Sequence, residues 1–228
     1  DKAFVDNIVS NPEDLAITKT ILAIAHSLGL GVIAEGVETE PQLALLARLG
    51  CDSIQGYYFS KPLPADICAQ WLRENRRLSL ERICRRPYQR TLLIVDDETA
   101  VLSSLKRELK PLDCRILTAK SGMEALSVFA RHDVSVVLSD QNMPGLKGIE
   151  LLHSIRKMYP RTIRMLLTAN SDFNTAFEAI NQGEIFRFVT KPWEGESLMA
   201  DIRAAFTLHE KQAMASRVSQ GEEVVTVA

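Results

Sequence analysis

The sequence predicts an α/β protein in which parallel strands alternate with helices. Three observations support this fold class. Short apolar runs recur along the 228 residues, and the gaps between them leave room for helices. Amphipathic patterns of helical period fill many of these gaps. Several of the apolar runs end abruptly in a polar residue, which is typical of a buried strand that brings one side chain to the edge of a sheet.

The first 72 residues show a βαβα rhythm. A helix is predicted to begin at Pro12 with Asn11 as its N-cap, and its apolar stripe comprises Ile17, Ile21, Ile24 and Leu28. Thr39 and Gln42 form a capping box for the next helix. We expect three strands, among them 32–34 and 53–54, and a last helix over 65–72. Such a segment is too small for an independent parallel sheet, which predicts a partial (β/α) barrel-type segment belonging to a larger domain.

Residues 73–89 are rich in arginine and are predicted to form a solvated helix and linker. A basic patch can contact nucleic acid, but this stretch has little aromatic content beyond Tyr88 and no recognition-helix pattern. We therefore expect no DNA binding. A domain is predicted over 90–208, and residues 209–228 form a polar tail that is too short for an output domain.

Regular alternation begins at Thr91. Strands are predicted at 91–95, 114–118, 134–139, 162–167 and 185–189, with helices between them. Five βα units with right-handed crossovers in about 120 residues predict a flavodoxin-like doubly wound five-stranded parallel sheet of order 2-1-3-4-5. Ligands of such sheets bind at the carboxyl ends of the strands, where the order reverses between the first and third strands.

Three carboxylates are expected at this reversal point. Asp96 and Asp97 follow the first strand, and Asp140 ends the third. Crowded carboxylates repel one another unless a cation neutralises them, and oxygen ligands favour a hard ion. We predict a Mg²⁺ site, with Mn²⁺ as the alternative ion. Asp97, Asp140 and the backbone carbonyl of Asn142 would bind the ion directly, and Asp96 would act mainly through water.

Two further polar groups end the fourth and fifth strands, namely the Thr168 hydroxyl and the Lys191 ammonium. Each alone has an ordinary role, as a turn hydroxyl or a surface charge. Together with the metal they predict phosphoryl transfer to Asp140 as nucleophile, in which the protein stabilises charge on the phosphoryl oxygens. Mg²⁺ would hold one oxygen, Lys191 a second, and Thr168 with a backbone N–H the third.

Residues 91 to about 208 resemble a receiver domain of a two-component response regulator. The motifs that carry this resemblance are Asp96-Asp97, Asp140 followed by Met143-Pro144-Gly145 and Gly148, Thr168-Ala169, and Lys191-Pro192. The family's frequent acidic residue before the glycine is replaced by Lys147. The resemblance implies that Asp140 accepts phosphate from a sensor histidine kinase, and that Lys191-Pro192 is a cis peptide.

The resemblance also implies an output mechanism. Phe188 matches the aromatic switch residue whose rotamer is coupled to Thr168. Phosphorylation would change the face built from the fourth helix, fifth strand and fifth helix of the receiver, through which a homodimer can form. Phe173, Phe177 and Trp193 lie in or next to that region and are candidates for either partner contacts or core.

Residues 1–72 resemble the last third of an EAL-type cyclic di-GMP phosphodiesterase. The motifs are Asp1-Lys2-Ala3-Phe4-Val5, Ala34-Glu35-Gly36-Val37-Glu38-Thr39, Leu49-Gly50-Cys51-Asp52, Gln55-Gly56-Tyr57-Tyr58 and Lys61-Pro62. The resemblance implies that Glu35 and Gln55 match metal- and substrate-site positions. The family's Glu-Ala-Leu signature, metal-binding Asp-Asp pair and catalytic lysine are absent. One glutamate cannot hold two divalent ions, so Glu35 and Gln55 are interpreted as a vestigial site in this chain.

Composition adds few constraints. The net charge is −2, 46% of residues are hydrophobic, and four widely spaced cysteines show no metal or redox pattern. No apolar run reaches the roughly 20 residues of a membrane span and no signal peptide is evident, so we expect a cytoplasmic protein without membrane insertion.

Two functions remain. The first is a phosphoacceptor signalling module, which is not itself an enzyme. The alternative is the C-terminal part of a receiver-regulated phosphodiesterase whose catalytic residues lie upstream of Asp1.

Overall fold

A five-stranded parallel sheet is the centre of the larger unit in the computed structural model, which describes residues 1–74, 90–169 and 185–219. The strands are β3 (Thr91–Val95), β4 (Arg115–Ala119), β5 (Val136–Asp140), β6 (Ile163–Thr168) and β7 (Arg187–Thr190). Their order is β4-β3-β5-β6-β7, and every neighbouring pair is parallel. The predicted doubly wound sheet of order 2-1-3-4-5 is confirmed.

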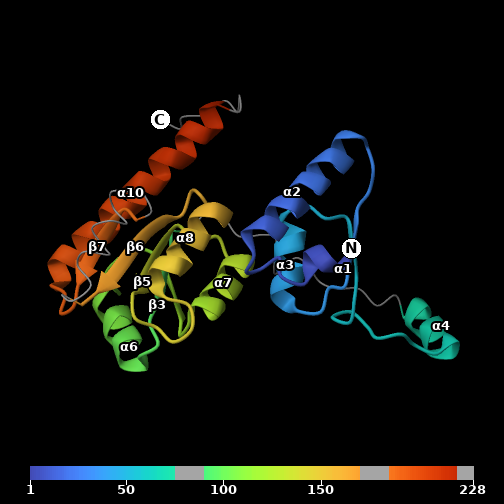
Figure 1. Ribbon diagram of the computed structural model, residues 1–228, viewed down its shortest axis with the longest axis horizontal. Coiled ribbons are helices and arrows are strands. Elements are labelled where there is room, and N and C mark those ends of the chain that lie inside the picture. Colours follow the sequence, from blue (N-terminus) through green and yellow to red (C-terminus); the bar gives the residue numbers. More distant parts are fainter. Residues whose placement is uncertain (75–89, 170–184, 220–228) are drawn as a thin grey trace. The chain divides into compact units, whose positions relative to one another are not determined.

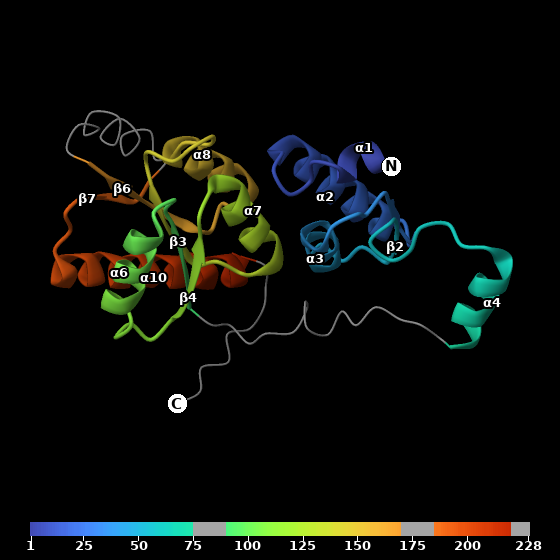
Figure 2. The ribbon, with the colours of Figure 1, turned by 90° about the horizontal axis from the view of Figure 1, so that it is seen from below.

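Four described helices connect or follow these strands: α6 (Thr99–Glu108), α7 (Gly122–Arg131), α8 (Gly148–Met158) and α10 (Gly195–Ser219). Helices α6 and α10 cover one face of the sheet, and α7 and α8 cover the other (Figures 1 and 2). Because both faces are covered, β3 and β5 are buried along their whole length. This explains why their sequences are continuous apolar runs instead of alternating ones.

The core under α6 and α10 is built from aliphatic side chains. Leu105 and Leu109 of the α6 region and Ile202 of α10 pack on the sheet, and all three are fully buried. Burial of one such aliphatic side chain contributes about 1.5–3 kcal/mol to the stability of the unit. The sheet that carries the strand ends is therefore a rigid support.

The strand ends differ slightly from the predicted ranges. Asp140 pairs in register with Leu167, and Thr168 pairs with Thr190. Both polar residues are thus the last members of the ladder, not residues that follow it. The hydrogen bonds of the parallel ladder continue through them and fix their backbone, so their side chains start from defined positions.

Residues 1–74 lie in a second compact unit, which is described by itself. Its helices are α1 (Lys2–Val5), α2 (Pro12–Ser27), α3 (Glu40–Arg48) and α4 (Ala65–Arg73), and its strands are β1 (Ile33–Glu35) and β2 (Ser53–Gln55). The expectation of three strands is wrong for this part of the chain, where β1 and β2 form a two-stranded parallel sheet. Residues 2–5 form a helical turn because the Asp1 side chain caps the N–H of Ala3.

The predicted helix starts of this unit are confirmed. The Asn11 side chain accepts the N–H of Glu13, and Thr39 and Gln42 form the capping box. The apolar stripe of α2 has an unexpected environment, because Ile21, Ile24 and Leu28 are 43%, 56% and 68% exposed. The opposite side of α2, with Leu15 and Leu22, is the buried one.

Candidate functional site

Four polar residues lie at the carboxyl edge of the five-stranded sheet. Asp140 and Thr168 end β5 and β6, while Asp96 and Lys191 directly follow β3 and β7. Because all strands are parallel, these ends share one edge. Asp96, Asp140 and Thr168 are almost fully buried, whereas Lys191 is partly exposed.

Lys191 joins the two buried carboxylates. Its Nζ lies 2.6 Å from Asp140 Oδ1 and 2.9 Å from Asp96 Oδ2. Burial lowers the pKa of Lys191, but the hydrogen bonds and charges of Asp140 and Asp96 outweigh burial and raise the pKa above its ordinary value. The side chain is therefore a permanent cation at neutral pH, held where two strand ends deliver negative charge.

The second oxygen of each carboxylate accepts a backbone N–H. Asn142 N lies 2.6 Å from Asp140 Oδ2, and Glu98 N lies 2.9 Å from Asp96 Oδ1. These local bonds fix the orientation of both carboxyl groups. The site thus has oriented oxygens on β3 and β5 instead of freely rotating carboxylates.

Thr168 is placed at the site, but its hydroxyl has another partner. Thr168 Oγ1 donates to the carbonyl of Ala169 at 3.1 Å, and the Thr168 carbonyl accepts the N–H of Lys191 at 2.8 Å. Phe188 is half-buried on β7, in register with Leu166 of β6. The Lys191-Pro192 peptide is cis, as the resemblance implies. Phe173 and Phe177 lie outside the described residues.

The donor set fits a hard divalent cation of the magnesium type. Two carboxylates and one ammonium leave a negative charge at a largely buried site, and the available ligands are oxygens. Asp97 is exposed beside Asp96. Within residues 1–74, 90–169 and 185–219, no group of three or more His, Cys, Asp or Glu side chains could enclose a metal. The expected convergence of Asp96, Asp97 and Asp140 into one group of three carboxylates is therefore not seen among these described residues.

The loop after Asp140 depends on Gly148, which belongs to the motif that carries the receiver resemblance, and on Gln141, which the sequence did not single out. A Cβ at Gly148 would overlap the carbonyl oxygen of Asp140, so only glycine fits. Buried Gln141 accepts the N–H of Ile149 through Oε1 at 3.1 Å and ties the loop to the start of α8. The signal available in the sequence was a polar residue inserted directly after a buried strand.

Trp193 and Glu108 form a second contact that sequence reasoning missed. Trp193 Nε1 donates to Glu108 Oε2 at 2.6 Å. Trp193 was a candidate for a partner contact or for core, and it is half-buried against the core under α6 and α10. No spacing rule relates residues that are 85 positions apart.

Glu35 and Gln55 end the two strands of the smaller unit. They are register partners on β1 and β2, and both are exposed. Nearby, Lys2 Nζ lies 2.7 Å from Glu38 Oε1.

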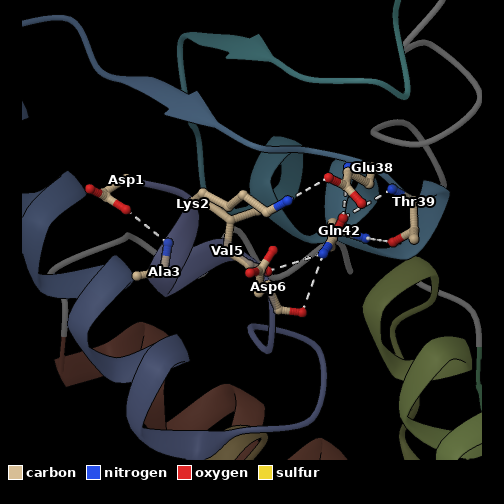
Figure 3. Close-up of polar contacts among 8 residues, drawn as sticks. All are labelled: Asp1, Lys2, Ala3, Val5, Asp6, Glu38, Thr39 and Gln42. Atoms are coloured by element: carbon tan, nitrogen blue, oxygen red, sulfur yellow. Dashed lines mark hydrogen bonds and ion pairs between the residues drawn. The ribbon is translucent and has the colours of Figure 1, made fainter. Parts of the chain in front are cut away.

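Figure 3 shows Gln42 between two segments: its Oε1 accepts the N–H groups of Glu38 and Thr39, and its Nε2 donates to carbonyls at the end of α1. Gln42 thus fixes the loop after β1 against α1.

Comparison with protein families gives two matches. Residues 92–203 match the response regulator receiver domain, and residues 1–62 match the EAL domain. No helix in the described part of the chain is long and apolar enough to cross a membrane.

Among curated relatives, the hydrogenase transcriptional regulatory protein HoxA of Cupriavidus necator is 37% identical over 117 residues, which is 51% of this chain and 24% of that protein. The cyclic di-GMP phosphodiesterase NbdA of Pseudomonas aeruginosa is 43% identical over 76 residues, which is 33% of this chain and 10% of that protein. The chain therefore spans only a small part of the length of these relatives.

Two solved structures are each similar in fold to more than half of this chain. The signal receiver domain of an HD domain-containing protein from Pseudomonas fluorescens Pf-5 is 33% identical, with a TM-score of 0.52 over 54% of this chain and 99% of that chain. A structure described as adenylate cyclase from Rhodopirellula baltica is also 33% identical, with a TM-score of 0.56 over 59% of this chain and 99% of that chain.

Proposed function

Residues 92–203 belong to the response regulator receiver family and residues 1–62 to the EAL domain family, and on this premise we propose that Asp140 is the phosphoacceptor of a signalling module. The observation that carries the proposal is the pair of contacts from Lys191 to Asp140 and Asp96. These contacts support a role for Asp140 as a nucleophilic carboxylate with a fixed orientation, and for Lys191 as the cation beside it. Phosphoryl transfer needs both, because its catalysis is mainly positioning and charge stabilisation.

In the proposed reaction a carboxylate oxygen of Asp140 attacks phosphorus, and the bond from phosphorus to the donor breaks. The donor is a phosphohistidine of a sensor histidine kinase, whose imidazole nitrogen takes the bonding electrons. Lys191 stabilises negative charge on one phosphoryl oxygen, and the Thr168 hydroxyl rotates from the Ala169 carbonyl to a second oxygen. Asp96, Asp97, Asp140 and the Asn142 carbonyl would hold Mg²⁺, or Mn²⁺ in its place. The bound ion supplies positive charge to the remaining phosphoryl oxygen.

The output proposed for this reaction is a change in the face built from the fourth helix, fifth strand and fifth helix of the receiver; β7 and α10 are the last two of these, and the expected fourth helix lies outside the described residues. Phe188 lies on β7 near Thr168, a position that suits a switch coupled to the Thr168 hydroxyl. That surface would bind a partner or a second copy of the chain. We place the module in the cytoplasm and expect neither DNA binding nor membrane insertion.

A second candidate concerns the larger protein of which this chain would be a part. The exposed side of α2 and the two-stranded sheet support the view that residues 1–74 complete an α/β barrel together with other residues. A receiver-regulated cyclic di-GMP phosphodiesterase would have this organisation, with its metal ligands and lysine upstream of Asp1. In this chain Glu35 and Gln55 are exposed and would have no catalytic task by themselves.

One experiment tests both candidates. The protein and its Asp140→Asn variant are incubated with acetyl phosphate and Mg²⁺, and intact mass is measured alongside cyclic di-GMP hydrolysis. We expect one phosphate-sized increment of mass, lost in Asp140→Asn, and no hydrolysis. An increment that persists in the variant would remove Asp140 from its role. Hydrolysis without an increment would favour the second candidate.

A further inference from the structure

Glu108 contacts the segment that connects Lys191 to α10. It is the last residue of α6, and its Oε2 accepts the Trp193 Nε1–H at 2.6 Å. The other oxygen, Oε1, lies so close to Gly195 that a Cβ at that position would overlap it. Both oxygens of one carboxylate are therefore directed at residues two and four positions after Lys191.

The hydrogen bond between Trp193 and Glu108 joins two groups that suit each other. An indole N–H that is partly buried against apolar side chains needs an acceptor, and a carboxylate is a strong one. Gly195 is also the first residue of α10, so the negative charge of Glu108 lies at the positive end of a helix dipole. Glycine at this position permits the close approach of the carboxylate.

The segment from Lys191 to Gly195 is held at both of its ends. At one end the N–H of Lys191 is bonded to the Thr168 carbonyl of β6. At the other end Glu108 of α6 accepts the indole N–H of Trp193 and lies close against Gly195. Helix α6 begins three residues after Asp96, which is one carboxylate partner of Lys191. Through Glu108, the same helix also contacts the segment that carries Lys191.

We propose that Glu108, acting through Trp193, is a positioning residue for Lys191, an inference that rests on the proposed phosphoacceptor role of Asp140. Lysine has a long flexible side chain, so its ammonium reaches a defined point only if its backbone is fixed. Without Glu108 the segment shifts, and Lys191 no longer meets the phosphoryl oxygen in the geometry of the transition state. Asp140 itself is unaffected, so phosphorylation slows but is not abolished.

The test measures the rate of phosphorylation by acetyl phosphate with Mg²⁺, from intact mass over time at several donor concentrations. Glu108→Ala and Trp193→Phe are expected to lower the maximal rate constant about tenfold, because small misplacements of a catalytic group are costly. Glu108→Gln keeps an oxygen acceptor for the indole and should restore the rate to within about twofold of the wild type. The control is Glu194→Ala, which removes an exposed carboxylate from the same segment.

Trp193 also reports the contact directly. In a Trp71→Phe background it is the single tryptophan, and Glu108→Ala should shift its emission to longer wavelength while Glu108→Gln shifts it less. A shifted emission with an unchanged rate constant would overturn the proposal, because the contact would be broken without effect on Lys191. If Glu108→Ala fails to fold, the rate constant of Trp193→Phe decides, and a value equal to that of the wild type would overturn the proposal. An unlabelled wild type would instead overturn the phosphoacceptor role on which the inference rests.

Discussion

Lys191 Nζ lies 2.6 Å from Asp140 Oδ1, although β7 and β5 are separated in the sheet by β6. The long lysine side chain spans this strand, and the ammonium also reaches Asp96 on the far side of β5. The ion pair therefore links three of the five strands at their carboxyl ends. Removing the ammonium would leave two buried carboxylates without this partner.

The first prediction concerns Lys191→Ala. The variant should still bind Mg²⁺, since the oxygen ligands are retained, but its labelling by acetyl phosphate should slow by about 10- to 1,000-fold, because a group that stabilises transition-state charge is gone. Calorimetric titration with Mg²⁺ and intact-mass kinetics measure the two effects separately. Lys106→Ala, which removes an exposed lysine from α6, is the control. Labelling at the wild-type rate would show that Lys191 has no part in the transfer.

The site could be predicted largely because the sheet is parallel. Each of Asp96, Asp140 and Lys191 is next to the end of an apolar run, and parallel pairing brings such ends together whatever the intervening loops do. A local pattern was sufficient because the long-range geometry follows from the fold class. The capping box of Thr39 and Gln42 could be predicted for a different reason, because it depends only on residues three positions apart.

Contacts between side chains that are distant in sequence could not be predicted in this way. The Glu108–Trp193 bond depends on where α6 ends relative to α10, and no periodicity encodes that. The stripe of α2 illustrates a second limit: a helical apolar pattern identifies a helix, but Ile24 and Leu28 are exposed in this structure. Periodicity indicates which side is apolar, and the neighbouring elements decide whether that side is covered.

The second prediction concerns the loop after Asp140. In Gly148→Ala the new methyl group would overlap the Asp140 carbonyl, so the loop must move. Overpacking of this kind costs about 1–3 kcal/mol of unfolding free energy, and a displaced Asp140 should also be phosphorylated more slowly. Urea unfolding and intact mass measure the two effects. Gly31→Ala is the control, because a Cβ there meets no atom within 4 Å. Equal stabilities of the two variants would contradict the argument.

The third prediction concerns buried Gln42 in the smaller unit. Gln42→Leu removes the acceptor of the Glu38 and Thr39 N–H groups and the donor to the α1 carbonyls (Figure 3). Leaving buried polar groups unsatisfied costs about 1–3 kcal/mol, so urea unfolding of this unit should begin at lower concentration. Gln70→Leu, which removes an exposed glutamine bonded to Glu74, should change stability by less than about 0.5 kcal/mol. A similar loss in both variants would show that burial of Gln42 is not the cause.

The fourth prediction is a pH dependence centred on Asp52. Its Oδ2 accepts the N–H of Val32 at 2.8 Å and lies 3.0 Å from His26 Nε2. The Val32 N–H first, and the His26 side chain second, hold the pKa of Asp52 below its ordinary value. A carboxyl pKa that is lower in the folded than in the unfolded state stabilises the fold above the unfolded pKa of about 3.9. This stabilisation is lost as the pH falls through the lowered folded value.

Carbonyl carbon NMR of the Asp52 carboxyl group over an acid titration measures this pKa. In His26→Gln the pKa should rise towards the ordinary value but remain below it, because the Val32 N–H is the larger of the two causes and is retained. In Asp52→Asn, unfolding of the smaller unit should lose the part of its acid dependence that falls below about pH 4. A pKa in His26→Gln equal to that of an unfolded peptide would show that the imidazole, and not the backbone N–H, stabilises the carboxylate.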